Sequence, residues 1–136
     1  MQAKIKWVGK RGFIGETESG NKIRMDIAME KGGGNTGPTP MELVLLALGG
    51  CTGLDVISIL EKKRAKLEGM EIKIEAEKTE NHPKVFKNKK IEYLFQGKDL
   101  KESDLKTAIE LSQEKYCSVS AILKKTAELS YSWTIL

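Results

Sequence analysis

The stretch "PMELVLLALGGCTGLDVISIL" (residues 40–60) decides the fold of this chain, because it is an apolar run long enough to form a buried helix. Gly49, Gly50 and Cys51 stand at its middle. Each glycine inside a helix costs about 0.5–1 kcal/mol relative to alanine, so the pair needs a local reason. One reason is close packing of the helix, with Cys51 as a small buried side chain. The other is space around the Cys51 sulfur for a small substrate or a second thiol.

The apolar surface of this helix predicts how it is covered. The helix is expected to start at Thr39-Pro40, a suitable N-cap and first helical position, and to run to about Lys66. Its side chains from Leu43 to Leu48 are apolar in every direction. A helix that is apolar all round must be buried on all sides, and one small sheet with one further helix covers only part of it. We therefore expect a second protomer to cover the rest, giving a homodimer.

Alternating patterns outside this helix predict strands. Apolar residues alternate in the segments 3–7, 23–27, 72–76, 91–95 and 127–135. Such alternation is typical of antiparallel strands with one buried face. A second helix is predicted in residues 103–117, with one apolar stripe made of Leu105, Ala108, Ile109 and Tyr116.

These elements predict one α+β domain over residues 1–136. Its expected parts are an N-terminal β-meander (1–30), the central helix with Cys51 (39–66), a β-hairpin (70–97), a second helical region with Cys117 (99–125) and a C-terminal strand (127–136) that opens at Ala127.

Composition and charge exclude several classes of function. Hydrophobic residues make up 40% and charged residues 31%, as in soluble globular domains. The net charge of +4 would suit a nucleic acid, but lysines and glutamates are interleaved and aromatic residues are only 6%, so no nucleic-acid partner is expected.

The first residues lack a secretory apolar segment. The apolar run Leu43 to Leu48 is too short to cross a bilayer, and Asp55 interrupts the apolar residues after it. We expect a cytoplasmic protein with no membrane partner.

The two cysteines are the candidate functional residues. A permanent disulfide is disfavoured in the cytoplasm. Cys51 and Cys117 are therefore buried side chains without a chemical role, metal ligands or redox groups. The single histidine, His82, is far from both in sequence, so no metal is predicted. Cys117 stands at a helix break in "EKYCSVSAIL", where backbone N–H groups of the following turn are placed to stabilise a thiolate.

The ordered pair of motifs "GPTPMELVLLALGGCTGLDV" and "KYCSVSAIL" resembles the OsmC/Ohr family of osmotically inducible and organic hydroperoxide resistance proteins. The resemblance extends over nearly the whole chain. It implies an OsmC-like fold, in which antiparallel sheets wrap two central helices in an intertwined homodimer. It also implies that the active sites lie at the subunit interface.

The resemblance further implies a thiol-dependent peroxidase that reduces organic hydroperoxides. Cys51 matches the peroxidatic cysteine, and Cys117 matches the resolving cysteine that forms a disulfide with it during turnover. Arg11 matches the arginine that stabilises the thiolate, with Arg24 as an alternative, and Glu42 matches the glutamate that holds this arginine. No bound cofactor, metal, haem or flavin is implied. Reducing equivalents come from an external dithiol, in characterised members often a lipoylated protein.

A second interpretation stays open. An OsmC-like protein can bind a small apolar ligand at the dimer interface without turnover. In that case Cys51 and Cys117 need not come within disulfide reach.

Overall fold

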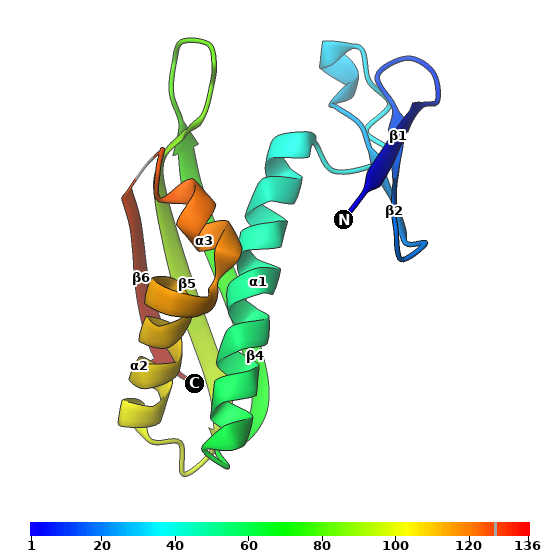
Figure 1. The fold of residues 1–136 in the computed structure, drawn as a ribbon. Helices are drawn as coiled ribbons and strands as arrows, with labels where there is room; N and C mark the ends of the chain where they lie inside the picture. The colour runs from blue at the N-terminus through cyan, green and yellow to red at the C-terminus, as the bar shows by residue number, and fades with distance from the viewer. Residues whose placement is uncertain (127) are drawn as a thin grey trace. The chain divides into compact units, whose positions relative to one another are not determined.

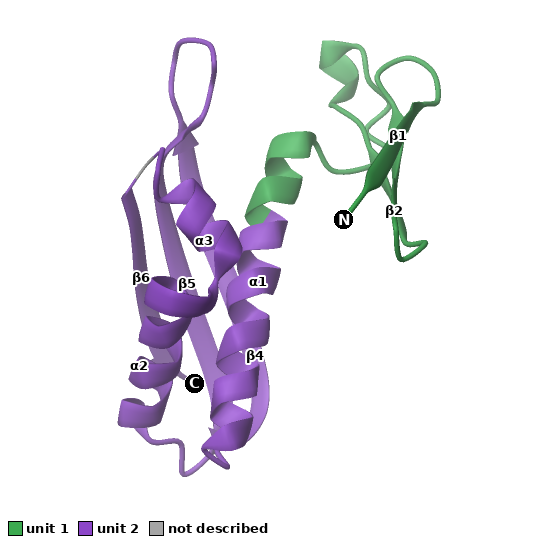
Figure 2. Ribbon diagram, viewed as in Figure 1, with its two compact units in different colours: residues 1–45 green, residues 46–136 purple. Residues whose placement is uncertain are grey.

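The computed structural model describes residues 1–126 and 128–136. The chain divides into two compact units, residues 1–45 and residues 46–136 (Figure 2). The single-domain assignment over residues 1–136 stays a prediction. Ala127, which opened the predicted C-terminal strand, lies outside the described residues.

The first unit is a three-stranded antiparallel meander; the sequence predicted a meander in residues 1–30 but identified its strands only at 3–7 and 23–27. The strands follow one another in the order β1-β2-β3 and comprise β1 (Ala3–Trp7), β2 (Phe13–Thr17) and β3 (Lys22–Met25). The turn between β1 and β2 has Gly9 at φ 102°, and the turn between β2 and β3 has Gly20 at φ 83°. Both values lie in the left-handed region that glycine adopts without steric cost.

A buried carboxylate holds the loop that follows β3. Asp26 accepts hydrogen bonds from the Ile27 amide at 2.8 Å, the Gly34 amide at 3.1 Å and the Thr36 hydroxyl at 2.5 Å. These bonds favour the ionised form, led by the bond from the Thr36 hydroxyl, and lower the pKa of Asp26 to about 2. The short 3-10 helix η1 (Met29–Lys31) lies within the loop closed by this carboxylate.

The central helix α1 (Pro40–Lys62) starts where the sequence predicted. The Thr39 amide donates to a carboxylate oxygen of Glu42 at 2.7 Å, and the Glu42 amide donates to the Thr39 hydroxyl at 3.2 Å. This reciprocal pair is a capping box, which satisfies two otherwise unpaired amides at the helix start. The helix ends before the predicted Lys66, because Arg64 takes a left-handed backbone conformation at φ 56° and the next strand begins.

The second unit contains a mixed sheet with the order β4-β5-β6. The hairpin of β4 (Lys66–Lys78) and β5 (Phe86–Lys98) is antiparallel, as predicted for residues 70–97. The α+β class is confirmed, but the expectation of purely antiparallel sheets is wrong for β6 (Glu128–Ile135), which runs parallel to β5.

A helical crossover causes this parallel pairing. Between β5 and β6 the chain passes through α2 (Glu102–Leu111), the π-helix η2 (Ser112–Tyr116) and α3 (Ser118–Leu123). A connection of this length returns the chain to the same end of the sheet, so that β6 enters in the direction of β5. Figure 1 shows α2, α3 and the second half of α1 on one face of this sheet.

The core of the second unit lies between these helices and the sheet. It is built from fully buried side chains of α1, β5 and α2, namely Leu48, Val56, Leu60, Ile91, Tyr93, Phe95, Leu105, Ala108 and Ile109. Tyr116, which the sequence placed on the same stripe as Leu105, is 50% exposed. The π-helical turn breaks the 3.6-residue period before this position, so the predicted stripe does not continue to it.

Glycines of α1 permit close contact with the sheet. A Cβ atom at Gly49 would lie 3.2 Å from Ile74 Cδ1, and one at Gly53 would lie 3.2 Å from Ile72 Cδ1. Gly49 therefore fits the close-packing interpretation. A Cβ atom at Gly50 would meet no described atom within 4 Å, so this glycine faces open space in the single chain.

The other side of α1 is apolar and exposed in the single chain. Leu54 is 72% exposed and Leu46 is 64% exposed. By length and composition alone, with a mean hydropathy of 2.1 over its most apolar 18 residues, α1 could cross a bilayer, although the run Leu43 to Leu48 is by itself too short to do so. Core helices of globular proteins satisfy the same criterion, and α1 contributes Leu48 to the core described above.

The Asp26 carboxylate should make stability acid-sensitive. Because its folded pKa of about 2 lies below the ordinary value of 3.8, its contribution is present above the ordinary value and is lost as the pH falls towards 2. Urea unfolding should show wild type more stable than Asp26→Asn at about pH 6, with a gap that shrinks below about pH 4. The exposed Asp99→Asn is the matched control. A gap that stays constant with pH would contradict this role of Asp26.

Candidate active site

The two cysteines of the second unit come together in the folded chain. Both are reduced; Cys51 is half-buried on α1, and Cys117 is 2% exposed between η2 and α3. Their sulfur atoms and a carboxylate oxygen of Asp55 all lie within 4.8 Å of one another. The predicted close approach of the two cysteines is therefore confirmed. A disulfide, with an S–S bond of about 2 Å, requires the sulfurs to move at most about 3 Å closer.

Asp55 belongs to this site, although sequence reasoning treated it only as an interruption of an apolar run. It follows Cys51 by four residues on α1, which places both side chains on one face of the helix. The Ser112 hydroxyl donates a hydrogen bond to Asp55 Oδ2 at 3.0 Å. The thiol-to-carboxylate spacing of four residues was the signal in the sequence that could have identified this pair.

The backbone around Cys117 breaks the helix as predicted. After the π-helix, Cys117 adopts an extended conformation with φ −72° and ψ 101°, and α3 begins at the next residue. Its sulfur caps α3 by accepting a hydrogen bond from the Ser120 amide at 3.4 Å, while its own amide donates to the Ser112 carbonyl at 2.8 Å. Single π-helical turns within helical segments are frequent at functional sites.

Burial sets the protonation state of Cys117. Removal from water raises the pKa of its thiol, and the neighbouring Cys51 raises it further, although the hydrogen bonds from Ser120 oppose both effects. Cys117 is thus held as a thiol at neutral pH. This state suits a group that waits for a partner sulfur better than one that attacks first.

A buried hydrogen-bond network surrounds the cysteines. The Thr52 hydroxyl is 2.6 Å from the Tyr93 hydroxyl and 2.7 Å from the Ser112 hydroxyl. The side-chain amide of Gln113 donates to Tyr93 at 2.9 Å and to Thr52 at 3.1 Å, and its carbonyl oxygen accepts from Ser120 at 3.1 Å. The network joins α1, β5, η2 and α3, and among the described residues every buried polar side-chain atom has a partner. The sequence analysis did not identify this hydrogen-bond network.

The other predicted site residues belong to the first unit. Arg11 is exposed in the turn between β1 and β2, and Glu42 completes the capping box of α1. Arg24, the alternative to Arg11, is exposed on β3 and donates from Nε to the Thr36 hydroxyl at 2.7 Å. That either arginine stabilises the Cys51 thiolate stays a prediction.

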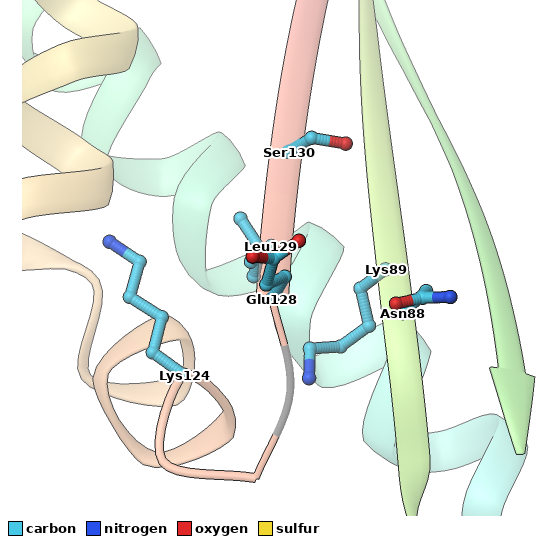
Figure 3. Close-up of a pocket in the computed structure, with 6 residues that line it drawn as sticks. All are labelled: Asn88, Lys89, Lys124, Glu128, Leu129 and Ser130. Carbon is cyan, nitrogen blue, oxygen red and sulfur yellow. The ribbon is translucent and has the colours of Figure 1, made fainter. Parts of the chain in front are cut away.

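A pocket of about 510 Å³ lies elsewhere in the second unit, around the start of β6 (Figure 3). Lys89 and Lys124 lie on either side of this strand in the view, but both ammonium groups donate to backbone carbonyls, those of Leu123 and Gln113. Burial also lowers the pKa of Lys89. Neither cysteine is among the described residues that line this pocket, so the cysteine cluster is the stronger candidate for chemistry.

Comparisons with known proteins agree on one family. A family model described as OsmC-like protein matches residues 32–132. Protein YhfA of Escherichia coli K12 is 40% identical over all of this chain and 98% of its own length. A hypothetical protein of Aquifex aeolicus has a crystal structure with a TM-score of 0.87 and 34% identity, covering 99% of this chain and 95% of that one. An organic hydroperoxide resistance protein of Legionella pneumophila, at 19% identity, shares the fold with a TM-score of 0.70, covering 98% and 95%.

Removal of the Thr52 hydroxyl should destabilise the chain. Thr52→Val preserves the shape of the side chain but leaves the buried hydroxyls of Tyr93 and Ser112 short of a partner, which should cost about 1–3 kcal/mol of unfolding free energy. Urea unfolding measures this loss. The exposed Ser58→Ala on the same helix is the control and should change stability by less than about 0.5 kcal/mol. Equal values for the two variants would show that the network does not hold these elements together.

Proposed function

Because this chain belongs to the family of OsmC-like proteins, we propose that it is a thiol-dependent peroxidase that reduces organic hydroperoxides to alcohols. The observation that carries the proposal is the pair of reduced cysteines whose sulfurs lie within 4.8 Å of each other. The fold shared with an organic hydroperoxide resistance protein supports the same class of chemistry. The alternative, binding of a small apolar ligand without turnover, gives no reason for the two thiols to meet.

The proposed reaction has two steps on the protein. The Cys51 thiolate attacks the distal oxygen of the hydroperoxide, the O–O bond breaks, and the departing alkoxide takes a proton to leave as an alcohol. Cys51 is then a sulfenic acid. The Cys117 thiol attacks that sulfur, a disulfide forms, and the hydroxyl leaves with the thiol proton as water.

An external dithiol completes the cycle. Two thiol–disulfide exchanges restore the Cys51 and Cys117 thiols and leave the reductant as a disulfide. The resemblance favours a lipoylated protein as this reductant, and the chemistry needs no bound cofactor. We place the enzyme in the cytoplasm, where such a cycle is kept supplied with reducing equivalents.

The environments of the two cysteines support this division of roles. Cys51 is half-buried and so can be reached by a small molecule, whereas Cys117 is 2% exposed and its pKa is raised by burial. A nearby cation would stabilise the attacking thiolate. We propose that Arg11 supplies this cation, with Arg24 as the alternative. We propose that Glu42 holds that arginine in place.

A homodimer would cover the apolar surfaces left by the single chain. Leu46, Leu54 and Ile57 form one exposed apolar face of α1, with Gly50 open on the same face. A contiguous face of this kind on a soluble protein marks an interaction site. We propose that two copies of α1 pack through this face, with the sheets wrapped around them in an intertwined dimer.

Substitution of each cysteine should separate the two roles. Cys51→Ser should abolish the consumption of cumene hydroperoxide, because no thiolate remains to attack. Cys117→Ser should consume about one equivalent per subunit and then stall with Cys51 as a sulfenic acid prone to over-oxidation. Ser58→Ala and Ser118→Ala are the exposed controls and should keep full turnover with a dithiol. Circular dichroism confirms that each variant is folded.

Mass spectrometry after one equivalent of hydroperoxide identifies the oxidised residue. An oxygen adduct on Cys117 in Cys51→Ser, with none on Cys51 in Cys117→Ser, would reverse the assignment of roles. Full turnover by both variants would refute the two-cysteine cycle.

A charge on the exposed face of α1 should break the dimer. Leu54→Glu should shift sedimentation equilibrium at micromolar concentration from dimer to monomer, because an uncompensated carboxylate would be buried. Ile122→Glu on α3 is the matched control, since Ile122 is similarly exposed, and it should remain dimeric. A wild-type monomer at this concentration, or a Leu54→Glu dimer of unchanged affinity, would contradict the proposed interface.

A further inference from the structure

The three groups that meet at the candidate site are also a set of metal ligands. One donor atom from each of Cys51, Asp55 and Cys117 lies within 4.8 Å of the other two. A tetrahedral zinc site with Zn–S bonds of about 2.3 Å places its sulfurs about 3.8 Å apart. The donor atoms therefore need to contract by at most about 1 Å to share one ion.

The chemical nature of these donors selects the metal. Two thiolates and one carboxylate are ligands of Zn²⁺, whereas Mg²⁺ and Ca²⁺ take oxygen ligands almost alone. Three protein ligands leave one position of the tetrahedron open, as in zinc sites that keep a water. The absence of a nearby histidine in the sequence argued against a metal, but Asp55 supplies the third ligand that the cysteines lack.

Hydrogen bonds behind the donors hold two of them in place. The Ser112 hydroxyl donates to Asp55 Oδ2 at 3.0 Å, and the Ser120 amide donates to the Cys117 sulfur at 3.4 Å. Both serines are fully buried, and both are tied to the wider network, Ser112 through Thr52 and Ser120 through Gln113. Supports of this kind orient metal ligands and are worth about 10–100-fold in affinity.

From this donor set we propose that the reduced protein binds one Zn²⁺ per chain through Cys51, Asp55 and Cys117. The oxidised protein does not bind it, because formation of the disulfide removes both sulfur ligands. Zinc at this site occupies the Cys51 sulfur and therefore inhibits the peroxidase; this inhibition rests on the proposed function, while the binding itself does not.

Competition with a chromophoric zinc indicator tests the binding. The reduced, metal-depleted full chain should take up one Zn²⁺, and so should the exposed control Asp99→Asn. Cys51→Ser, Cys117→Ser and Asp55→Asn should each bind at least about tenfold more weakly. Circular dichroism shows that each variant is folded, and titration of wild type alkylated at its cysteines gives the same answer without substitution. Failure of the reduced wild type to bind, or equal affinity in all variants and in the oxidised protein, would overturn the site.

A separate activity measurement keeps the two proposals apart. In buffer with a chelator the wild type should consume cumene hydroperoxide, and a stoichiometric addition of Zn²⁺ without chelator should suppress this activity. Zinc uptake that depends on the three residues in a chain without peroxidase activity would support the site and refute the proposed function. Peroxidase activity unchanged by zinc that is demonstrably bound would refute the inhibition.

Discussion

The hydroxyl of Thr52 connects three elements of the second unit, α1, β5 and η2. It lies 2.6 Å from the Tyr93 hydroxyl on β5 and 2.7 Å from the Ser112 hydroxyl in η2, fully removed from water. A buried hydroxyl that loses its partner costs about 1–3 kcal/mol, so a relative shift of helix, strand or π-turn that breaks these bonds is disfavoured by about that amount. Thr52 is the residue next to Cys51, and the Ser112 carbonyl accepts a hydrogen bond from the amide of Cys117. These bonds therefore help to hold the backbone that carries both sulfurs.

The same hydrogen bonds explain how polar side chains are accommodated within the apolar layer. Cys51, Thr52 and Asp55 come from a helix whose other core contacts include leucine, valine and isoleucine side chains. Thr52 and Asp55 are tolerated because the crossover from β5 to β6 brings glutamine and serine side chains against them, and Cys51 lies beside Cys117 from the same crossover. The π-helical turn is the part of that crossover that carries Ser112 and Gln113 inward, and it leaves Cys117 directly at its end.

The sequence was sufficient for most of the elements and for the two cysteines. The capping box of α1 is a local pattern, and so are the alternating strands of the β4–β5 hairpin, because each depends on residues a few positions apart. Cys51 and Cys117 were found because each stands beside a departure from simple packing, a glycine pair and a helix break. Their meeting could be inferred only from the resemblance of the two motifs to a family.

Other features could not be read from local pattern. The partner of Thr52 on β5 is 41 residues away and its partner in η2 is 60 residues away, so no local spacing reveals the network. Alternation shows which face of a strand is buried but not the direction in which the strand runs, so the parallel pairing of β6 was missed. β6 also has a consequence for the growing chain. Among the described residues, β5 is the central strand, and its second edge pairs with residues 128–135, which follow it in the chain only after the helical crossover. Until those residues emerge from the ribosome, the most buried strand of the folded sheet presents a row of unpaired backbone groups to other chains nearby.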